Sequence, residues 1–593
     1  MKSKEYSRYL YWLMPAMVFV TAETVMGNLG SIDPLCILLN LAVYYMLYLG
    51  VYTIFRTTKG WAVLNVLLYV LALVEYFVIS FRERPAMIWD VLAIRTAMTV
   101  SANYNYEITL TMALTGAVII LLSVWAWKCP VRMNRGKSWC VWLAGSAGFL
   151  YVLFAMIAPA CKLDVPMWDP VVSFENEGVV LATALSFKSV IPPRPDGYSE
   201  TEAAVPESAE GNSADVVPTN VICIMNESFS DLRVFNGLVG DRCFETDKPF
   251  LEFYDSLSED PNAQKGNLYV PVFGAMTANS EYEVLTGNSC AFVPQGSIPY
   301  QFFTEPGDNS LAKIFGEQGY ETIAMHPYPG YNWNRTEAYE NLGFDQFLDQ
   351  EFYDELEKEL GTEFVRPRDY MSDQSDYDAI LHLLKEKETD EKLFIFNVTM
   401  QNHGGFEVEN LESTVHVTEL NGESCEGQYP KADQYLALIQ MSDEALKYFL
   451  GELEQVEEPT MVVMFGDHQP SVETEFFEAL YGKRWTEVPG ELKINSFKTP
   501  YMIWTNYDRT CSDAGDMSAF LLGNEVLEEA GIAPTGLFAA ADGLQESYDA
   551  VHAMGVLEKD GTFTDSMEQD GLDGFPDIRR YHVLQYYEIF GKE

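Results

Sequence analysis

Long apolar runs are confined to roughly the first 160 residues of this 593-residue chain. Five of them reach the roughly 20 residues that a helix needs to cross the hydrocarbon core of a bilayer. They span residues 9–27, 34–55, 61–81, 110–127 and 140–160. Tryptophans lie near their ends, where amphipathic rings favour the headgroup zone. The pattern therefore predicts a transmembrane domain of five helices over residues 1–162.

The flanking charges predict how these helices are oriented, because cytoplasmic loops accumulate Lys and Arg. With the N-terminus inside, Arg82, Arg84 and Arg95 are the only basic residues of 1–160 that lie outside. The basic residues that fall inside are Lys2, Lys4, Arg8, Arg56, Lys59, Lys128, Arg132, Arg135 and Lys137. The first run lacks a small-residue cleavage pattern, so we expect a retained span. An odd number of spans makes this a multi-pass cell-membrane protein whose C-terminal part is extracellular.

Two acidic residues, Glu23 and Glu75, lie within the predicted spans, where an ionisable group indicates a function. Both are toward the outer ends of their spans, so solvation at the membrane interface is the favoured interpretation. The outer loop 82–109 mixes aromatic and polar residues and could guide lipid headgroups.

A polar linker at residues 191–218, rich in Pro, Ser, Glu and Ala, separates the spans from a second pattern. Short buried runs at 221–225, 322–325, 393–398, 461–465 and 501–504 alternate there with helical stretches. This alternation predicts an α/β domain with a mostly parallel sheet between helices. We expect an extracellular juxtamembrane segment and linker at 163–218, a core at 219–510 and a small C-terminal subdomain at 511–593.

Charge and cysteine content narrow the possible functions. The formal net charge of -49 argues against nucleic acid and against a basic membrane-docking patch. Exposed charges are screened beyond about 10 Å at roughly 0.1 M salt, so a cleft can still bind an anion. The nine cysteines show no CxxC spacing, so neither a zinc cluster nor a disulfide-stapled domain is expected.

Polar residues follow several of the predicted buried strands, where open α/β sheets bind ligands. Glu227 follows 221–225, although it could equally cap the next helix. Asp467 and His468 follow 461–465 and offer the oxygen and nitrogen ligands of a divalent cation, with a structural hydrogen-bonded pair as the alternative.

Thr277 stands after a Gly-containing turn, with Glu281 one helical turn later. A hydroxyl at a helix N-terminus meets free N–H groups and the positive end of the dipole, which suits phosphate chemistry. Beside a metal it can ionise and act as a nucleophile. A simple N-cap is the alternative interpretation.

Five motifs occur in a fixed order: NES, FGAMTANSEYE, HPYPGYNWNRTEAYENLGF, MQNHGGF and FGDHQP. In this order, and with the predicted spans before them, they resemble lipoteichoic acid synthases and related phosphoglycerol transferases of the alkaline phosphatase/sulfatase superfamily. The resemblance covers nearly the full chain. No Cys or Ser stands in a CxPxR context at the nucleophile, which excludes the formylglycine of true sulfatases.

The resemblance implies roles for individual residues. A metal site with manganese, or magnesium or zinc, falls on Glu227, Thr277, Asp467 and His468, and Thr277 is the nucleophile. His326, Trp333 and Arg335 match residues that hold glycerol phosphate, and the fork of Arg335 suits phosphate oxygens. His403 matches a phosphate-side histidine that could protonate the leaving oxygen, unless it is structural. Pro327 and Tyr328 depart from the family's small or polar residues.

These expectations define an enzyme that transfers glycerol phosphate from phosphatidylglycerol, through Thr277, to a glycolipid, polymer or glycan acceptor and releases diacylglycerol. Phosphoethanolamine transfer is a close alternative, since it uses a similar layout. A non-catalytic envelope protein that binds a metal or a teichoic-type polymer is the alternative from another class.

Overall fold

A computed structural model describes the chain apart from residues 1, 83–84, 87–107, 133–137, 162, 164–169, 187–193, 196–197, 200–215, 295, 407–410, 510–514, 566–573 and 592–593. The chain forms two compact units, one of residues 1–191 with 294–296 and one of residues 192–293 with 297–593. Most of the loop 82–109 and of the linker 191–218 lies outside the described residues.

The N-terminal unit is helical. Its longer helices are α1 (Lys2–Met26), α2 (Pro34–Phe55), α3 (Lys59–Arg82), α6 (Leu110–Lys128) and α7 (Ser138–Val152), followed by the π-helical turn η2 (Leu153–Ile157), α8 (Ala158–Ala160), α9 (Pro170–Glu177) and α10 (Val179–Ser186). Four helical segments are long and apolar enough to cross a membrane, at residues 34–55, 59–80, 110–128 and 139–157. The first helix carries a shorter apolar stretch, Tyr11–Met26. The chain is therefore a membrane protein, and the count of five spans stays a prediction.

Glu23 and Glu75 are both buried in the N-terminal unit, so the expected interfacial solvation is wrong for both. Glu23 is 0% exposed and accepts a hydrogen bond from the Val179 backbone N–H at 3.1 Å. Asn40 accepts one from the Leu181 N–H at 3.2 Å. These two side chains satisfy N–H groups at the start of α10, which otherwise have no partner within the helix. Glu75 is 1% exposed and accepts from the Ala86 N–H at 2.8 Å.

The second unit is built on an eight-stranded sheet with the order β11-β3-β10-β9-β1-β6-β4-β5. Its strands are β1 (Asn220–Asn226), β3 (Ala263–Tyr269), β4 (Tyr320–Met325), β5 (Gln346–Leu348), β6 (Lys392–Val398), β9 (Thr460–Gly466), β10 (Lys498–Thr505) and β11 (Met517–Ser518). All five predicted strands are present. The sheet is mostly parallel, as predicted, except that β10 runs antiparallel to both β9 and β3.

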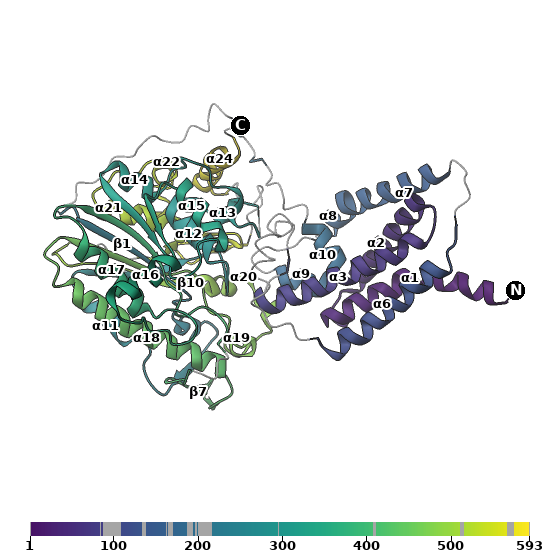
Figure 1. Cartoon of the computed structure of the whole chain (residues 1–593), viewed down its shortest axis with the longest axis horizontal. Helices are drawn as coiled ribbons and strands as arrows, with labels where there is room; N and C mark the ends of the chain where they lie inside the picture. The colour runs from purple at the N-terminus through teal and green to yellow at the C-terminus, as the bar shows by residue number, and fades with distance from the viewer. Residues whose placement is uncertain are drawn as a thin grey trace. The chain divides into compact units, whose positions relative to one another are not determined.

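Helices cover both faces of this sheet (Figure 1), because its central strands are apolar on both sides. In β1, Val221 and Cys223 enter one core while Ile222 and Ile224 enter the other. The first core is covered by α12 (Thr277–Thr286), α14 (Leu311–Glu317), α15 (Arg335–Asn341), α21 (Leu522–Glu529), α22 (Gly536–Ala540) and α24 (Pro576–Phe590). The second is covered by α11 (Glu252–Ser256), α16 (Gln350–Leu360), α17 (Asp373–Glu386), α18 (Pro430–Leu453) and α19 (Thr474–Tyr481).

The C-terminal residues add to the first of these cores. Phe520, Leu537 and Tyr581 belong to the same buried cluster as Val284 of α12. The C-terminal residues also form a small separate sheet of β12 (Tyr548–His552), β13 (Gly555–Glu558) and β14 (Phe563–Thr564). A second small sheet joins β2 (Phe244–Thr246), β7 (Val417–Leu420) and β8 (Glu423–Ser424). A subdomain boundary near residue 510 stays a prediction.

Four neighbouring strands, β9, β1, β6 and β4, are mutually parallel, so their carboxyl ends lie along one edge of the sheet. The loops that follow them carry most of the predicted site residues. Two of these loops approach very closely at Gly466, the last residue of β9. A Cβ atom there would lie 1.7 Å from the carbonyl oxygen of Phe229, so only glycine fits.

Candidate functional site

Glu227, Asp467 and His468 meet at the carboxyl edge of the sheet. One ligand atom from each lies within 4.8 Å of the other two. All three residues are buried, with exposed fractions of 3%, 0% and 3%. The structure thus brings together three of the four predicted metal ligands from loops that are far apart in the sequence.

The electrostatics of this cluster favour a bound cation. Burial and the nearby Glu227 carboxylate raise the pKa of Asp467 to about 7, and burial raises the pKa of Glu227 as well. Asp467 Oδ1 accepts a hydrogen bond from the Ser228 N–H at 2.7 Å. Oδ2 is buried and accepts none among the described residues. Two buried carboxylates with an unpaired oxygen are costly unless a positive charge compensates them.

The His468 ring is oriented so that a nitrogen faces the carboxylates. Its Nδ1 lies 3.0 Å from the carbonyl oxygen of Gln469, which fixes that nitrogen as the donor. In the neutral ring Nε2 then carries the lone pair, and it lies 3.3 Å from Asp467 Oδ2 and 3.6 Å from Glu227 Oε1. Three lone-pair-bearing atoms face one another here. This donor set of two carboxylates and one imidazole fits a divalent cation.

Thr277 is the first residue of α12, and its hydroxyl reaches the same cluster. Thr277 Oγ1 donates a hydrogen bond to Glu227 Oε2 at 3.3 Å. Met276, just before it, has a left-handed backbone with φ of 73°, an uncommon conformation for a residue with a side chain. One turn later the Ser280 hydroxyl donates to the Asp467 carbonyl oxygen at 2.6 Å. This second contact holds the start of α12 against the loop after β9.

A second cluster forms around Arg335, which is only 2% exposed. Its guanidinium donates to the Glu281 carboxylate, with Nε 3.0 Å from Oε1. Tyr339 donates to the other Glu281 oxygen at 2.6 Å. His326 Nδ1 lies 2.9 Å from the Val398 carbonyl oxygen, so Nε2 accepts from Arg335 Nη1 at 3.0 Å.

The charge state of this second cluster is set by its own members. Burial and the Arg335 charge lower the pKa of His326 well below its ordinary value, which keeps the imidazole neutral. The hydrogen bonds to Glu281 and His326 use three of the five N–H groups of Arg335, and the other two can bond a phosphate oxygen. Glu227 also senses this charge, because Arg335 counteracts part of the rise in the Glu227 pKa.

Trp333 precedes Arg335 by two residues in a strained turn. Trp333 and Asn334 both have left-handed backbones, with φ of 57° and 66°. The indole is half-buried and packs against the core beneath α12 and α15. The turn begins α15, so its geometry and the placement of Arg335 are coupled.

His403 follows β6 and keeps an exposed surface. Desolvation of the His403 ring and the positive charge of the nearby Arg368 guanidinium both lower the pKa of its imidazole. Arg368 donates to the carbonyl oxygens of Gln401 and Gly405, at 2.9 and 3.1 Å, and to that of His403. It thereby fixes the backbone of the QNHGG loop. Asp467 and His468 also influence the His403 pKa, so His403 lies near the first cluster.

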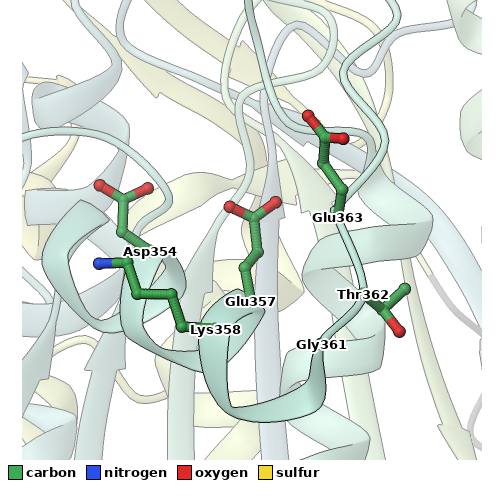
Figure 2. A pocket seen from close by; sticks show the side chains of 6 residues that line it. All are labelled: Asp354, Glu357, Lys358, Gly361, Thr362 and Glu363. Carbon is green, nitrogen blue, oxygen red and sulfur yellow. The ribbon is translucent and has the colours of Figure 1, made fainter.

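Two contributors to the site were not predicted from the sequence. Glu281 neutralises Arg335, and its spacing of four residues from Thr277, on one helical face, was the available signal. Arg368 gave no signal, because it reaches the QNHGG loop only through the fold. A hollow of about 310 Å³ at the end of α16 shares no residue with either cluster (Figure 2). Its lining is acidic, and Glu357 there is already paired with Arg366 at 2.8 Å.

Comparisons with known proteins place this architecture. The family model described as Sulfatase matches residues 219–532. A putative cyclic beta-1,2-glucan modification protein of Rhizobium meliloti (strain 1021) is 28% identical over 459 residues, or 74% of this chain and 66% of the relative. The lipoteichoic acid synthase of Staphylococcus aureus (strain USA300) is 26% identical over 258 residues, or 42% of this chain and 35% of that protein.

Among solved structures, the phosphoglycerol transferase GacH of Streptococcus pyogenes in complex with sn-glycerol-1-phosphate is similar with a TM-score of 0.48 and 21% identity. The match covers 68% of this chain and 96% of that one. The aligned regions span less than two thirds of the length of either curated relative. The sulfatase model nevertheless covers more than half of this chain and all of the predicted site residues. The chain therefore belongs to the sulfatase family, within the alkaline phosphatase superfamily, as its motifs predicted.

Proposed function

We propose that this membrane protein transfers glycerol phosphate from phosphatidylglycerol to a glycan or glycolipid acceptor and releases diacylglycerol. One observation carries the proposal: the Thr277 hydroxyl, at the start of a helix, lies 3.3 Å from a carboxylate of the buried Glu227, Asp467 and His468 cluster. A hydroxyl in such a setting is suited to nucleophilic attack on phosphorus.

The reaction has two steps in which Thr277 is first modified and then restored. Thr277 Oγ1 passes its proton to the Glu227 carboxylate that it already bonds and attacks the phosphorus of the lipid headgroup, and the bond from phosphorus to the diacylglycerol oxygen breaks. The leaving oxygen takes up a proton, for which His403 is the candidate donor, since a bound anionic headgroup opposes the lowering of its pKa. The deprotonated donor then takes the proton of an acceptor hydroxyl as this hydroxyl attacks the same phosphorus, and the Thr277 oxygen recovers its proton from Glu227 as it leaves.

The remaining residues bind and orient the substrate. Arg335, held by Glu281 and His326, offers N–H groups to the phosphate oxygens. Trp333 offers an indole face to the glycerol carbons. A divalent cation held by Glu227, Thr277, Asp467 and His468 would supply positive charge that favours ionisation of the hydroxyl and offsets charge on the phosphoryl oxygens. We expect manganese, with magnesium or zinc as alternatives.

The membrane helices and the names of the relatives support this donor and acceptor. Helices in the bilayer keep the catalytic unit near a lipid donor, and the charge pattern around the spans supports an extracellular location. The similarity to a lipoteichoic acid synthase supports a phosphoglycerol donor. The similarity to a glucan modification protein supports a glycan as the acceptor.

Covalent labelling tests the proposal directly. Full-length protein in detergent with manganese is incubated with phosphatidylglycerol or phosphatidylethanolamine, and the peptide that contains Thr277 is weighed by mass spectrometry. We expect a glycerol phosphate adduct on Thr277 together with diacylglycerol release, and neither in Thr277→Ala. An adduct only from phosphatidylethanolamine would replace the donor, and equal background in both proteins would favour a binding protein.

A further inference from the structure

Four rings form a continuous row between the two predicted phosphate-side histidines. The ring of His326 lies 6.3 Å from that of Tyr328, which lies 6.0 Å from that of Tyr370. The Tyr370 ring in turn lies 5.0 Å from that of His403. We call this row the aromatic wall. It joins the loop after β4 to the loop after β6 at the same edge of the sheet as Thr277.

The aromatic wall is held in place from behind. The Arg368 guanidinium lies 5.4 Å from the centre of the Tyr370 ring and 5.6 Å from that of Phe406. The same guanidinium is fixed by the backbone carbonyl groups of the QNHGG loop. The side chains of the wall are therefore already ordered before a ligand binds. Little of their conformational entropy is lost on binding.

The members of the wall differ in accessibility. His326 is 1% exposed, whereas Tyr328 and Tyr370 are half-buried and His403 is exposed. The accessible members are thus two tyrosines and one histidine, whose neighbouring ring planes are inclined at 61° and 50° to one another. Such rings pack against the C–H face of a sugar while their polar atoms bond its hydroxyl groups.

The charge of the chain favours a neutral ligand at this wall. A formal net charge of -49 repels a long polyanion, although screening limits the effect to short range. An acceptor made of repeated glycerol phosphate units is such a polyanion. A neutral glycan carries no such cost.

We propose that the aromatic wall is the acceptor subsite and that it packs against a pyranose ring of a neutral glycan. The wall then holds a sugar hydroxyl beside the phosphorus on Thr277. The identification of this sugar as the acceptor rests on the proposed function. Binding of the sugar to the wall does not, because it needs neither donor nor nucleophile.

Binding can therefore be measured separately from catalysis. The probe is a linear β-1,2-linked gluco-oligosaccharide, titrated by calorimetry into the full-length protein in detergent without donor lipid. Tyr328→Ala and Tyr370→Ala should each weaken binding by about tenfold, which is the effect of losing one stacked ring. Tyr370→Phe keeps the ring and should bind within about twofold of the unchanged protein.

Tyr331→Ala is the matched control. Tyr331 lies in the same loop as Tyr328, is 54% exposed and is not part of the aromatic wall. It should leave binding unchanged. In transfer assays, Tyr370→Ala should raise the acceptor KM far more than it lowers kcat.

Three results would overturn the inference: no glycan binding by the unchanged protein, equal weakening by Tyr331→Ala, or tighter binding of a soluble glycerol phosphate oligomer than of the glucan. Failure of Thr277 to become labelled would defeat the proposed function instead, and glycan binding at the wall would stand.

Discussion

The two buried charge clusters of the catalytic unit are assembled in opposite ways. Around Arg335, the Glu281 carboxylate balances the charge of the guanidinium, and the neutral His326 accepts one of its hydrogen bonds. Around Asp467, two carboxylates and an imidazole lone pair face one another, and one buried oxygen has no hydrogen-bond partner among the described residues. The first cluster is neutralised within the protein, whereas the second has the donor atoms and the uncompensated charge that fit a cation.

This difference separates stability from chemistry. A self-neutralised pair is strongly destabilised when one partner is removed. A cluster of like charges is instead relieved by losing a member and stabilised by binding an ion. Variants in the two clusters should therefore move stability in opposite directions, while both should reduce transfer.

The largest expected effect is on Thr277, the proposed nucleophile beside the Glu227, Asp467 and His468 cluster. Thr277→Ala should lower phosphoglycerol transfer by at least about 10³-fold, because the substitution removes the hydroxyl that is proposed to form the covalent intermediate. Thr277→Ser keeps the hydroxyl and should retain most of the activity. Diacylglycerol release is the measurement, and substantial activity in the alanine variant would rule out the Thr277 intermediate.

The cluster around Arg335 is broken by Glu281→Gln. This change leaves the buried Arg335 without its counter-charge and should lower the free energy of unfolding by about 3–5 kcal/mol. Thermal unfolding of the full-length protein in detergent gives the comparison. The double variant Glu281→Leu with Arg335→Met should recover most of that stability without recovering transfer. If the double variant is also active, Arg335 does not bind the phosphate.

Cation binding tests the cluster around Asp467. Manganese at 100 times its dissociation constant should stabilise the protein by about 2.7 kcal/mol, seen as a rise in the unfolding temperature that a chelator reverses. Asp467→Asn should abolish this rise. With chelator present the same variant should be more stable than the unchanged protein, because a like charge is gone. A loss of stability there would contradict the proposed electrostatic conflict.

The smallest expected effect comes from Glu283, a buried acid in neither cluster. Burial raises its pKa to about 8 from an ordinary 4.5, although the Cys290 N–H bonds to its carboxylate. Because the pKa is higher in the folded state, the folded protein holds the Glu283 proton more tightly than the unfolded chain does. The contribution of the protonated carboxyl to stability is therefore complete below pH 4.5 and is lost as pH rises through about 8.

Between these values Glu283 should reduce the free energy of unfolding by up to about 1.4 kcal/mol per pH unit. Glu283→Gln should remove that part of the slope in a plot of unfolding temperature against pH. Glu340→Gln, an exposed acid on α15, should leave the slope as it is. An unchanged slope in Glu283→Gln would show that its carboxyl is ionised normally in the folded protein.

Local patterns predicted much of this fold because the relevant signals are local. The apolar runs 221–225, 393–398 and 461–465 are best interpreted as buried strands, and parallel strands bring their carboxyl ends to one edge. The convergence of Glu227, Asp467 and His468 follows from that rule. The placement of Thr277 required the resemblance as well, since a threonine at a helix start is more often a simple cap.

The remaining contacts depend on how loops approach one another, and no spacing in the sequence encodes them. β3 is too polar to be recognised as a strand, yet it pairs antiparallel with β10 and widens the sheet. Arg368 meets the QNHGG loop across 33 residues, and its partners are backbone atoms that any residue could supply. Glu23 was expected at the membrane surface because its role as a cap for α10 depends on a helix 156 residues away.

Gly466 shows how little room the catalytic edge leaves. The strand that delivers Asp467 presses so tightly against the carbonyl of Phe229 that even a methyl group would have to displace one of the two chains. The distance between the two carboxylates is thus governed by a side chain that consists of one hydrogen atom. A larger side chain at position 466 would push apart the two backbone segments that carry Glu227 and Asp467. It would thereby change the distance between the two carboxylates without altering either residue.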